Sequence, residues 1–318
     1  FLEDYRVDLN FARSETQEGR INFLDTNDTF GGKTYAMDGE KFSGTAKNIR
    51  LRHIVEGSYS GIRYKDVSPT YRSSVGLVSK NNYKERNYWH GRTFRYEGSL
   101  RKISLHASKQ NRLNYQGQKT RERLELKLNA ETSLNLKGEL EFVTKASEIF
   151  EGQRFGQQDE IKLAVQFSPS ETFTLGYRYE VGDQIAYNIN TPVIGDQKTQ
   201  NISAGIKFSD ALRINLQQRF TELRSKTTNE EFYGGEINRF ELDYQFGNAL
   251  SSRLIVEKND FQDNYYLEGL MQWKPDPYTI FYIGGTQYYK KPNPFSDNLR
   301  METSQIYLKF QYFYNPNS

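Results

Sequence analysis

The sequence predicts an all-β fold, a transmembrane antiparallel β-barrel of about sixteen strands, and three observations lead to this prediction. Apolar and polar residues alternate with period two over stretches of roughly ten residues, the length of a tilted membrane strand. Short turns alternate with long loops, as in bacterial outer-membrane barrels. Aromatic residues are abundant, with 23 Tyr and 21 Phe, although the mean hydropathy of the 318-residue chain is only −0.82. A barrel explains both values because only the lipid side of each strand must be apolar.

The composition argues against several other classes of protein. The chain has no cysteine and only three histidines, so we expect no disulfide, metal site or cofactor. No run approaches the 18 or so apolar residues of a transmembrane helix. The 43 basic residues nearly balance the 40 acidic ones, which gives no reason to expect nucleic-acid binding. The first residues lack a signal peptide's basic and apolar regions, which suggests a mature or excised segment.

The N-terminal half contains the less regular strands. Alternation is clear at residues 5–11, and it returns at 124–130 and 134–142. The segments near 47–56, 57–66 and 87–96 are noisier. If these include a loop hairpin, fourteen strands is the alternative count.

The C-terminal half alternates more regularly, and helical spacing fits none of its segments. Apolar residues occupy every second position in seven stretches: 161–167, 173–179, 202–208, 212–216, 240–246, 267–273 and 306–312.

The links between the predicted strands fall into two length classes. Seven are short and rich in turn-forming residues, for example Ser168-Pro169-Ser170, and eight are longer. An even strand count with both termini on the periplasmic, short-turn side is what a closed barrel requires, because a bilayer tolerates no unpaired strand edge. Residues 1–318 are therefore expected to form one domain. A soluble β-sandwich or β-solenoid is the alternative fold, but it explains neither the aromatic apolar faces nor the alternating links.

Alternation also predicts which way side chains point, because successive residues of a strand face opposite sides. The predicted lipid-facing residues are Leu124, Leu126, Leu128, Leu163, Val165, Phe173, Leu175, Ile214, Leu216, Leu242, Leu308 and Phe310. The predicted lumen-lining residues are Lys102, His106, Arg123, Glu125, Lys127, Lys137, Glu139, Glu141, Lys162, Arg178, Glu180, Lys207, Arg213, Arg219, Arg239, Glu241, Asp243 and Lys309. Basic residues outnumber acidic ones in the second set, so a pore would modestly favour anions. The opposite charges could equally pair across the wall.

Candidate catalytic groups are few. Some outer-membrane barrels are hydrolases, and His106 is the histidine that alternation places on a polar face, where a lining role explains it better. The carboxylate pairs Glu139/Glu141 and Glu241/Asp243 have the spacing of an acid and base, but they lie among Arg and Lys. Cross-strand ion pairing explains them better, so we predict no catalytic, metal or cofactor site.

Two segments resemble one known family. The segment 64–78 contains, at residues 66–77, Asp-Val-Ser-Pro-Thr-Tyr-Arg-Ser-Ser-Val-Gly-Leu, which resembles a stretch of the form Asp-(Ile/Val)-Ser-Pro-x-(Phe/Tyr)-Arg-Ala-Asp-x-Gly-Phe. Residues 270–277 and 306–313 resemble the same family's last turn and closing strand. These are Gram-negative outer-membrane proteins of unknown function, in which a family 9 carbohydrate-binding-like module precedes a C-terminal barrel. Ser73-Ser74 departs from the usual Ala-Asp, the module is absent from this chain, and no catalytic residues carry over.

Three hypotheses for function follow. The first is a non-enzymatic channel or translocation component of the bacterial outer membrane, for which the resemblance suggests glycan-derived solutes. The second is a structural anchor, or a subunit of a larger envelope complex, with a plugged lumen. The third is an outer-membrane hydrolase. The expected partners are outer-membrane lipid and periplasmic or surface proteins, without nucleic acid.

Overall fold

The structure is a computed structural model that describes residues 3–20, 29–34, 36, 38–73, 80–150, 152–291 and 298–314. Its contacts divide the chain into two compact units. Unit 1 comprises Phe1–Tyr96, Lys102–Asn129 and Glu141–Glu160, and unit 2 comprises Glu97–Arg101, Ala130–Leu140 and Ile161–Ser318. In the described residues we find no helix with the length and apolar content needed to cross a membrane.

The described residues form sixteen strands of ten or more residues, which confirms the predicted all-β fold and strand count. These strands are β1 (Tyr5–Gln17), β4 (Lys41–Val55), β5 (Ser58–Val67), β6 (Tyr83–Arg95), β7 (Leu100–Leu113), β8 (Lys119–Thr132), β9 (Leu136–Phe150), β11 (Gln158–Ser170), β12 (Phe173–Ile185), β13 (Ile194–Lys207), β14 (Leu212–Ser225), β15 (Glu231–Gln245), β16 (Leu250–Asn259), β17 (Asn264–Asp276), β18 (Thr279–Lys290) and β19 (Arg300–Tyr312). Three short strands accompany them: β2 (Thr29–Phe30), β3 (Lys33–Thr34) and β10 (Gln153–Phe155).

In unit 1 the strand order is β1-β4-β5-β6-β7-β8-β9, and β10 folds back onto β9. The β1–β4, β4–β5, β5–β6 and β6–β7 pairings are antiparallel. The three noisy segments of the sequence are β4, β5 and β6. Their alternation is obscured because Tyr59 and Trp89 lie among polar side chains, each covering a glycine on the neighbouring strand. A Cβ added to Gly91 would come within 2.3 Å of Tyr59, and one added to Gly61 within 2.1 Å of Trp89.

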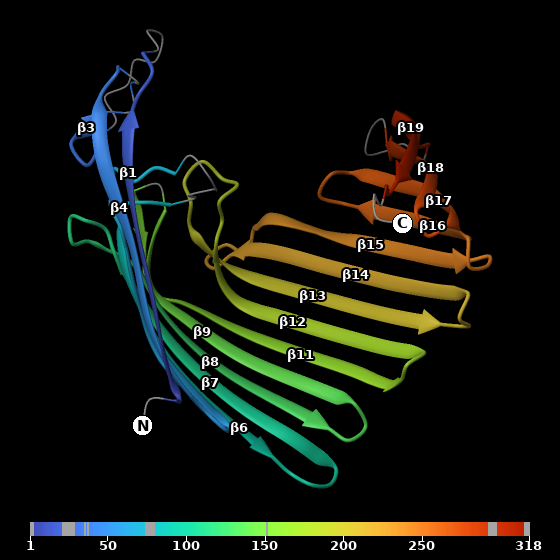
Figure 1. Cartoon of the computed structure of the whole chain (residues 1–318), viewed down its shortest axis with the longest axis horizontal. Helices are drawn as coiled ribbons and strands as arrows, with labels where there is room; N and C mark the ends of the chain where they lie inside the picture. The colour runs from blue at the N-terminus through green and yellow to red at the C-terminus, as the bar shows by residue number, and fades with distance from the viewer. Residues whose placement is uncertain are drawn as a thin grey trace. The chain divides into compact units, whose positions relative to one another are not determined.

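In unit 2 each strand from β12 to β19 pairs antiparallel with the next one along the chain. Figure 1 shows β12 to β15 running side by side. β19 pairs with β18, and in unit 1 β1 pairs with β4. Pairing of β1 with β19, which barrel closure requires, stays a prediction.

The links alternate in length as the sequence indicated, but several turns lie a few residues from their predicted positions. The turn predicted at residues 130–132 is in fact at 133–135, because Asn135 takes the left-handed conformation (φ 56°) and Thr132 Oγ1 accepts a hydrogen bond from the Leu136 N–H at 3.3 Å. The first long link is shorter than predicted, since β1 extends to Gln17 and β4 begins at Lys41. Strand edges are hard to place because a polar residue can end a strand or continue its polar face.

Each unit is built from a single layer of strands, so few apolar side chains are buried. Many of the buried ones lie near the long-link ends, for example Val67 in unit 1 and Ile185 and Leu223 in unit 2. Most other apolar side chains are exposed on one face of the strands. This arrangement is the reverse of a water-soluble domain, whose apolar side chains pack inside.

Candidate functional site

All twelve predicted lipid-facing residues lie at alternate positions of their strands, on what we call the apolar face of each unit. Leu126 is 45% exposed and Leu308 is 78% exposed. The exposed members are Leu124, Leu126, Leu128, Leu163, Leu175, Leu216, Leu308 and Phe310, and the half-buried members are Val165, Phe173, Ile214 and Leu242. Contact of this face with lipid stays a prediction.

All eighteen predicted lumen-lining residues occupy the intervening positions, on the polar face. The strand register supports this placement. On β14 and β15, Arg213 lies opposite Asp243 and Ile214 opposite Leu242, so charged residues pair with charged and apolar with apolar. Several charges on the polar face form ion pairs. Glu141 lies 3.5 Å from Lys127, and Asp243 lies 2.8 Å from Arg253. Glu141 and Asp243 therefore form cross-strand ion pairs, as the sequence predicts.

The sequence reasoning missed the most strongly charged part of the polar face. We call it the basic ladder; it lies in unit 1 on β1, β4, β5 and β7. Arg50 lies directly opposite Arg63, and Asn48 opposite Lys65. Its six cations are Arg6, Arg50, Arg52, Arg63, Lys65 and Arg112.

Two carboxylates stand within the basic ladder. Asp8 lies 2.8 Å from Arg52, 3.2 Å from Arg6 and 3.5 Å from Arg50. Glu85, only 3% exposed, lies 2.5 Å from Arg112 and 3.6 Å from Arg63. Six cations against these two carboxylates leave an excess of four positive charges.

The guanidinium groups of the ladder retain unused hydrogen-bonding capacity. The Nε atoms of Arg50, Arg52 and Arg63 are shielded from solvent and have no hydrogen-bond partner in the described structure. Like charges directly opposite each other on a strand pair are destabilising, so two carboxylates do not account for this arrangement. The sequence signal was the i, i+2 spacing of Arg50 with Arg52 and of Arg63 with Lys65, which places each pair on one face.

The resemblance segment also lies against the polar face of unit 1. Within Ser68–Arg72, Ser68 Oγ accepts a hydrogen bond from the Thr45 N–H at 2.8 Å, and the Arg72 N–H donates to Ser14 Oγ at 3.0 Å. A Cβ on Gly44 would lie 2.3 Å from the backbone of Tyr71, so the segment depends on that glycine. Residues 74–78 of the resemblance lie outside the described residues.

Arg72 fixes this segment from its other side. Its guanidinium lies 4.3 Å from the Phe30 ring centroid and 5.5 Å from that of Phe42. It also donates hydrogen bonds to the carbonyl oxygens of Pro69 and Tyr71. The Ser68–Arg72 segment is therefore held against β1 and β4 at their long-link ends.

Lys80, in the link between β5 and β6, is affected by the positive charge of the ladder. Burial lowers the pKa of the Lys80 ammonium, and Arg112 and Arg121 lower it further by repulsion. A lysine that is easier to deprotonate indicates a locally positive, partly dry environment.

His106 has no catalytic geometry in the described structure. Its Nδ1 lies 3.1 Å from the Tyr59 hydroxyl, and the two rings stack with centroids 5.9 Å apart. We interpret His106 as a packing partner of the tyrosine that covers Gly91.

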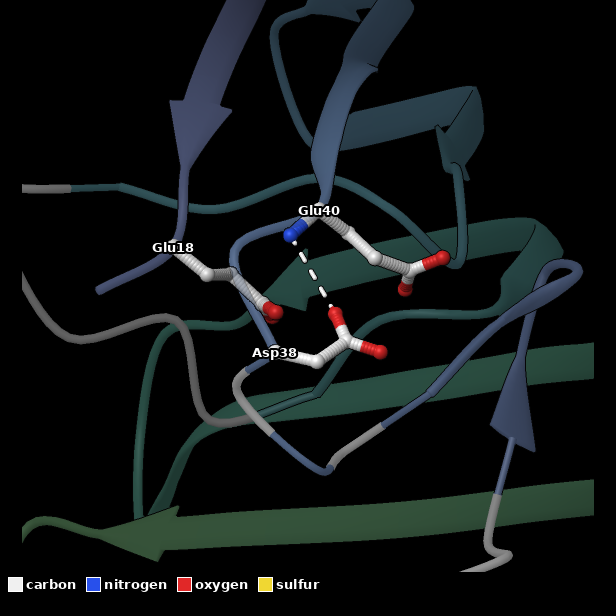
Figure 2. Close-up of side chains that lie close together, drawn as sticks. All are labelled: Glu18, Asp38 and Glu40. Atoms are coloured by element: carbon white, nitrogen blue, oxygen red, sulfur yellow. Dashed lines mark hydrogen bonds between the residues drawn. The ribbon is translucent and has the colours of Figure 1, made fainter. Parts of the chain in front are cut away.

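Three carboxylates lie together at the link between β1 and β4: Glu18, Asp38 and Glu40, whose oxygens lie within 4.8 Å of one another. Figure 2 shows the Glu40 N–H donating to Asp38, at 3.3 Å. The sequence reasoning did not find this group. Hard cations such as Ca²⁺ bind carboxylate oxygens. However, Glu40 already accepts from the Thr34 N–H at 2.9 Å and lies 3.4 Å from Lys33 Nζ, so we interpret the group as a network that fixes the link.

In unit 2 the polar face is hollowed near the short turns. One depression of about 380 Å³ is lined by Lys207, Arg213, Asp243 and Arg253. Lys207 pairs with Asp210 at 2.6 Å, and Arg253 pairs with Asp243. The pairing of Lys207 lowers the pKa of Asp210, which lies in the turn. Charges here are closely balanced, in contrast to the basic ladder.

Comparisons with known proteins find solved structures that align with most of this chain. No family model matches the sequence. No curated protein matches it either. The outer membrane channel DcaP of Acinetobacter baumannii aligns over 98% of both chains, with 11% identity and a TM-score of 0.41. A mutant of the Rh. blastica porin aligns over 90% of this chain and 95% of its own, with 13% identity and a TM-score of 0.38. OmpT, an outer membrane protein of Vibrio cholerae, covers 98% of both chains at 8% identity, with a TM-score of 0.30. Outer-membrane channels and porins are the class that the sequence predicts. All three TM-scores lie below 0.5.

Proposed function

We propose that this chain is an outer-membrane β-barrel that forms a water-filled, non-enzymatic passage with a preference for anionic solutes. The basic ladder is the observation that carries the anion preference. The two-faced strands carry the membrane location.

The apolar face supports the membrane location. It exposes leucine, isoleucine and phenylalanine on strand after strand, and burial of such a side chain contributes about 1.5–3 kcal/mol relative to leaving it in water. A bilayer supplies that burial without a second layer of protein. The strands are also long enough, since the shortest of the sixteen has ten residues.

The polar face supports passage of anions. Charges of one sign in a channel with low-dielectric walls raise the local concentration of the opposite ion. The cations of the ladder lie at nearby positions on β1, β4, β5 and β7, so its four excess positive charges are concentrated in one region. Arginine donors in this setting suit carboxylate and phosphate groups, which accept two parallel hydrogen bonds from one guanidinium. A glycan-derived origin of the solutes remains a separate hypothesis that rests on the family resemblance.

Reversal potentials in planar bilayers test this proposal. In a salt gradient the purified protein should conduct with a potential of the sign that anion preference requires. The double variant Arg50→Gln/Arg63→Gln should move the potential toward zero. Arg213→Gln/Arg239→Gln is the matched control, because it removes two polar-face arginines outside the ladder. Cation preference in the unchanged protein, or equal shifts in both variants, would contradict the proposed role of the ladder.

The alternative of a plugged structural subunit is favoured by one feature, the Ser68–Arg72 segment on the polar face. Stable membrane insertion without measurable conductance, together with stoichiometric co-purification of another envelope protein, would support that alternative.

A further inference from the structure

Five polar side chains interrupt the apolar face of unit 1 near the short turns. They project from β4, β5 and β6 at the alternate positions that also carry Leu51, Ile62 and Tyr88. We call them the His–Arg patch: His53, Ser58, Ser60, His90 and Arg92.

Strand register brings these side chains together in two adjoining rows. Ser60 lies opposite His53 on one side and opposite His90 on the other, and Ser58 lies opposite Arg92. The Ser60 hydroxyl lies 2.8 Å from His90 Nδ1. His90 is exposed, and this contact directs its other imidazole nitrogen away from Ser60.

Neighbouring rings support the two basic edges of the patch. The Tyr5 and His53 ring centroids are 4.5 Å apart. The Arg92 guanidinium lies 5.0 Å from the Phe94 centroid. In the part of the chain that the structure describes, Arg92 forms no ion pair with a carboxylate, so its hydrogen-bond donors are available.

In unit 2, the apolar-face residues at the same distance from the short-turn strand ends are different. There the apolar face carries Trp273, Phe281 and Phe310. The ring centroid of Phe281 lies 5.1 Å from that of Trp273 and 5.0 Å from that of Phe310. Phe281 is two residues inside its strand end, and so are His53 and Ser60. Aromatic rings at this level mark the membrane–water interface, where lipid headgroups lie.

We propose that the His–Arg patch binds the phosphodiester of an anionic phospholipid in the leaflet next to the short turns, an inference that rests on the proposed membrane location. Charge complementarity favours this occupant: an arginine fork, imidazole N–H groups and serine hydroxyls are all donors suited to phosphate oxygens. Basic groups at the headgroup level recognise lipids in this way.

Lipid titration of the detergent-solubilised protein tests the inference. Native mass spectrometry should show phosphatidylglycerol retained in preference to phosphatidylcholine. Arg92→Gln should weaken phosphatidylglycerol binding about fivefold, as expected for one basic residue at an anionic lipid surface. His90→Gln should weaken it less. Lys109→Gln is the matched control: its side chain shares the apolar face but lies two positions from His90's partner Ala107 and pairs with Glu122 at 3.6 Å, and we expect binding to be unchanged.

A second measurement uses the unchanged protein alone. Phosphatidylglycerol should raise its melting temperature more than phosphatidylcholine or inorganic phosphate at the same concentration does. Equal effects of both lipids, or equal retention by Arg92→Gln and the parent, would overturn the inference. Protection by inorganic phosphate equal to that by the lipid would indicate a simple anion site and would also overturn it. Failure to insert into vesicles would instead contradict the proposed function, so the two failures are distinguishable.

Discussion

The polar faces of the two units differ in how their charges are balanced. On β15 and β16 of unit 2, Arg239 lies 3.1 Å from Glu257 and Arg253 lies 2.8 Å from Asp243. In unit 1 the basic ladder has six cations and two carboxylates, and one of them, Glu85, is buried. Balanced ion pairs use up the hydrogen-bonding groups of the strand wall. An excess of positive charge instead leaves hydrogen-bond donors for a solute. Alternation alone places charges on a face, but only the strand register shows which of them are paired.

Replacing Glu85 should cause the largest loss of stability that distinguishes unit 1 from unit 2. Glu85→Gln leaves Arg63 and Arg112 without their shared carboxylate in a shielded position, and such a loss costs about 3–5 kcal/mol. Asp243→Asn removes a partner from Arg253, but both side chains are well exposed, so we expect about 1 kcal/mol or less. Urea unfolding in lipid vesicles measures both. Equal losses in the two variants would show that the ladder is no more dependent on its carboxylates than unit 2 is.

The apolar faces should behave alike where the polar faces differ. Leu126→Arg in unit 1 and Leu163→Arg in unit 2 should each destabilise the inserted protein by about 2–4 kcal/mol if they lie near the bilayer midplane. Lys127→Arg and Lys162→Arg keep the charge and lie on the polar face, so they should leave insertion nearly unchanged. Heat-modifiability on gels and refolding into vesicles report the effect. If Leu163 and Gln166 tolerate arginine equally, the faces are assigned wrongly.

The sequence predicted the number of strands and their two faces because both depend on a local period of two. It did not predict the basic ladder, since Tyr59 and Trp89 mask the alternation on β5 and β6 and the match of Arg50 to Arg63 depends on register. The packing of Ser68–Arg72 was beyond prediction for a related reason. It depends on contacts with Gly44 and Phe30, which come from other parts of the chain.

That segment gives a test confined to unit 1. Gly44→Ala places a methyl group where the Tyr71 backbone lies, so the segment must shift, at a cost typical of overpacking, about 1–3 kcal/mol. Single-channel conductance should rise as the segment leaves the polar face. Gly269→Ala is the control in unit 2, because a Cβ there meets nothing within 4 Å. Unchanged conductance with a clear loss of stability would show that the segment does not narrow the passage.

The smallest expected effect concerns the link between β7 and β8. Burial, and then the hydrogen bond that Tyr115 donates to Asp66, raises the pKa of the Tyr115 phenol above its ordinary value near 10. The folded protein thus holds this proton more tightly than the unfolded chain does, so the contact stabilises fully below pH 10 and its contribution declines as the pH rises above that value. The melting temperature of the parent should therefore fall more than that of Tyr115→Phe between pH 9 and about pH 11. Because Tyr115 is still partly exposed, water screens the interaction and the difference should be small. Parallel melting curves for the two proteins across this range would show that the contact with Asp66 does not persist in solution.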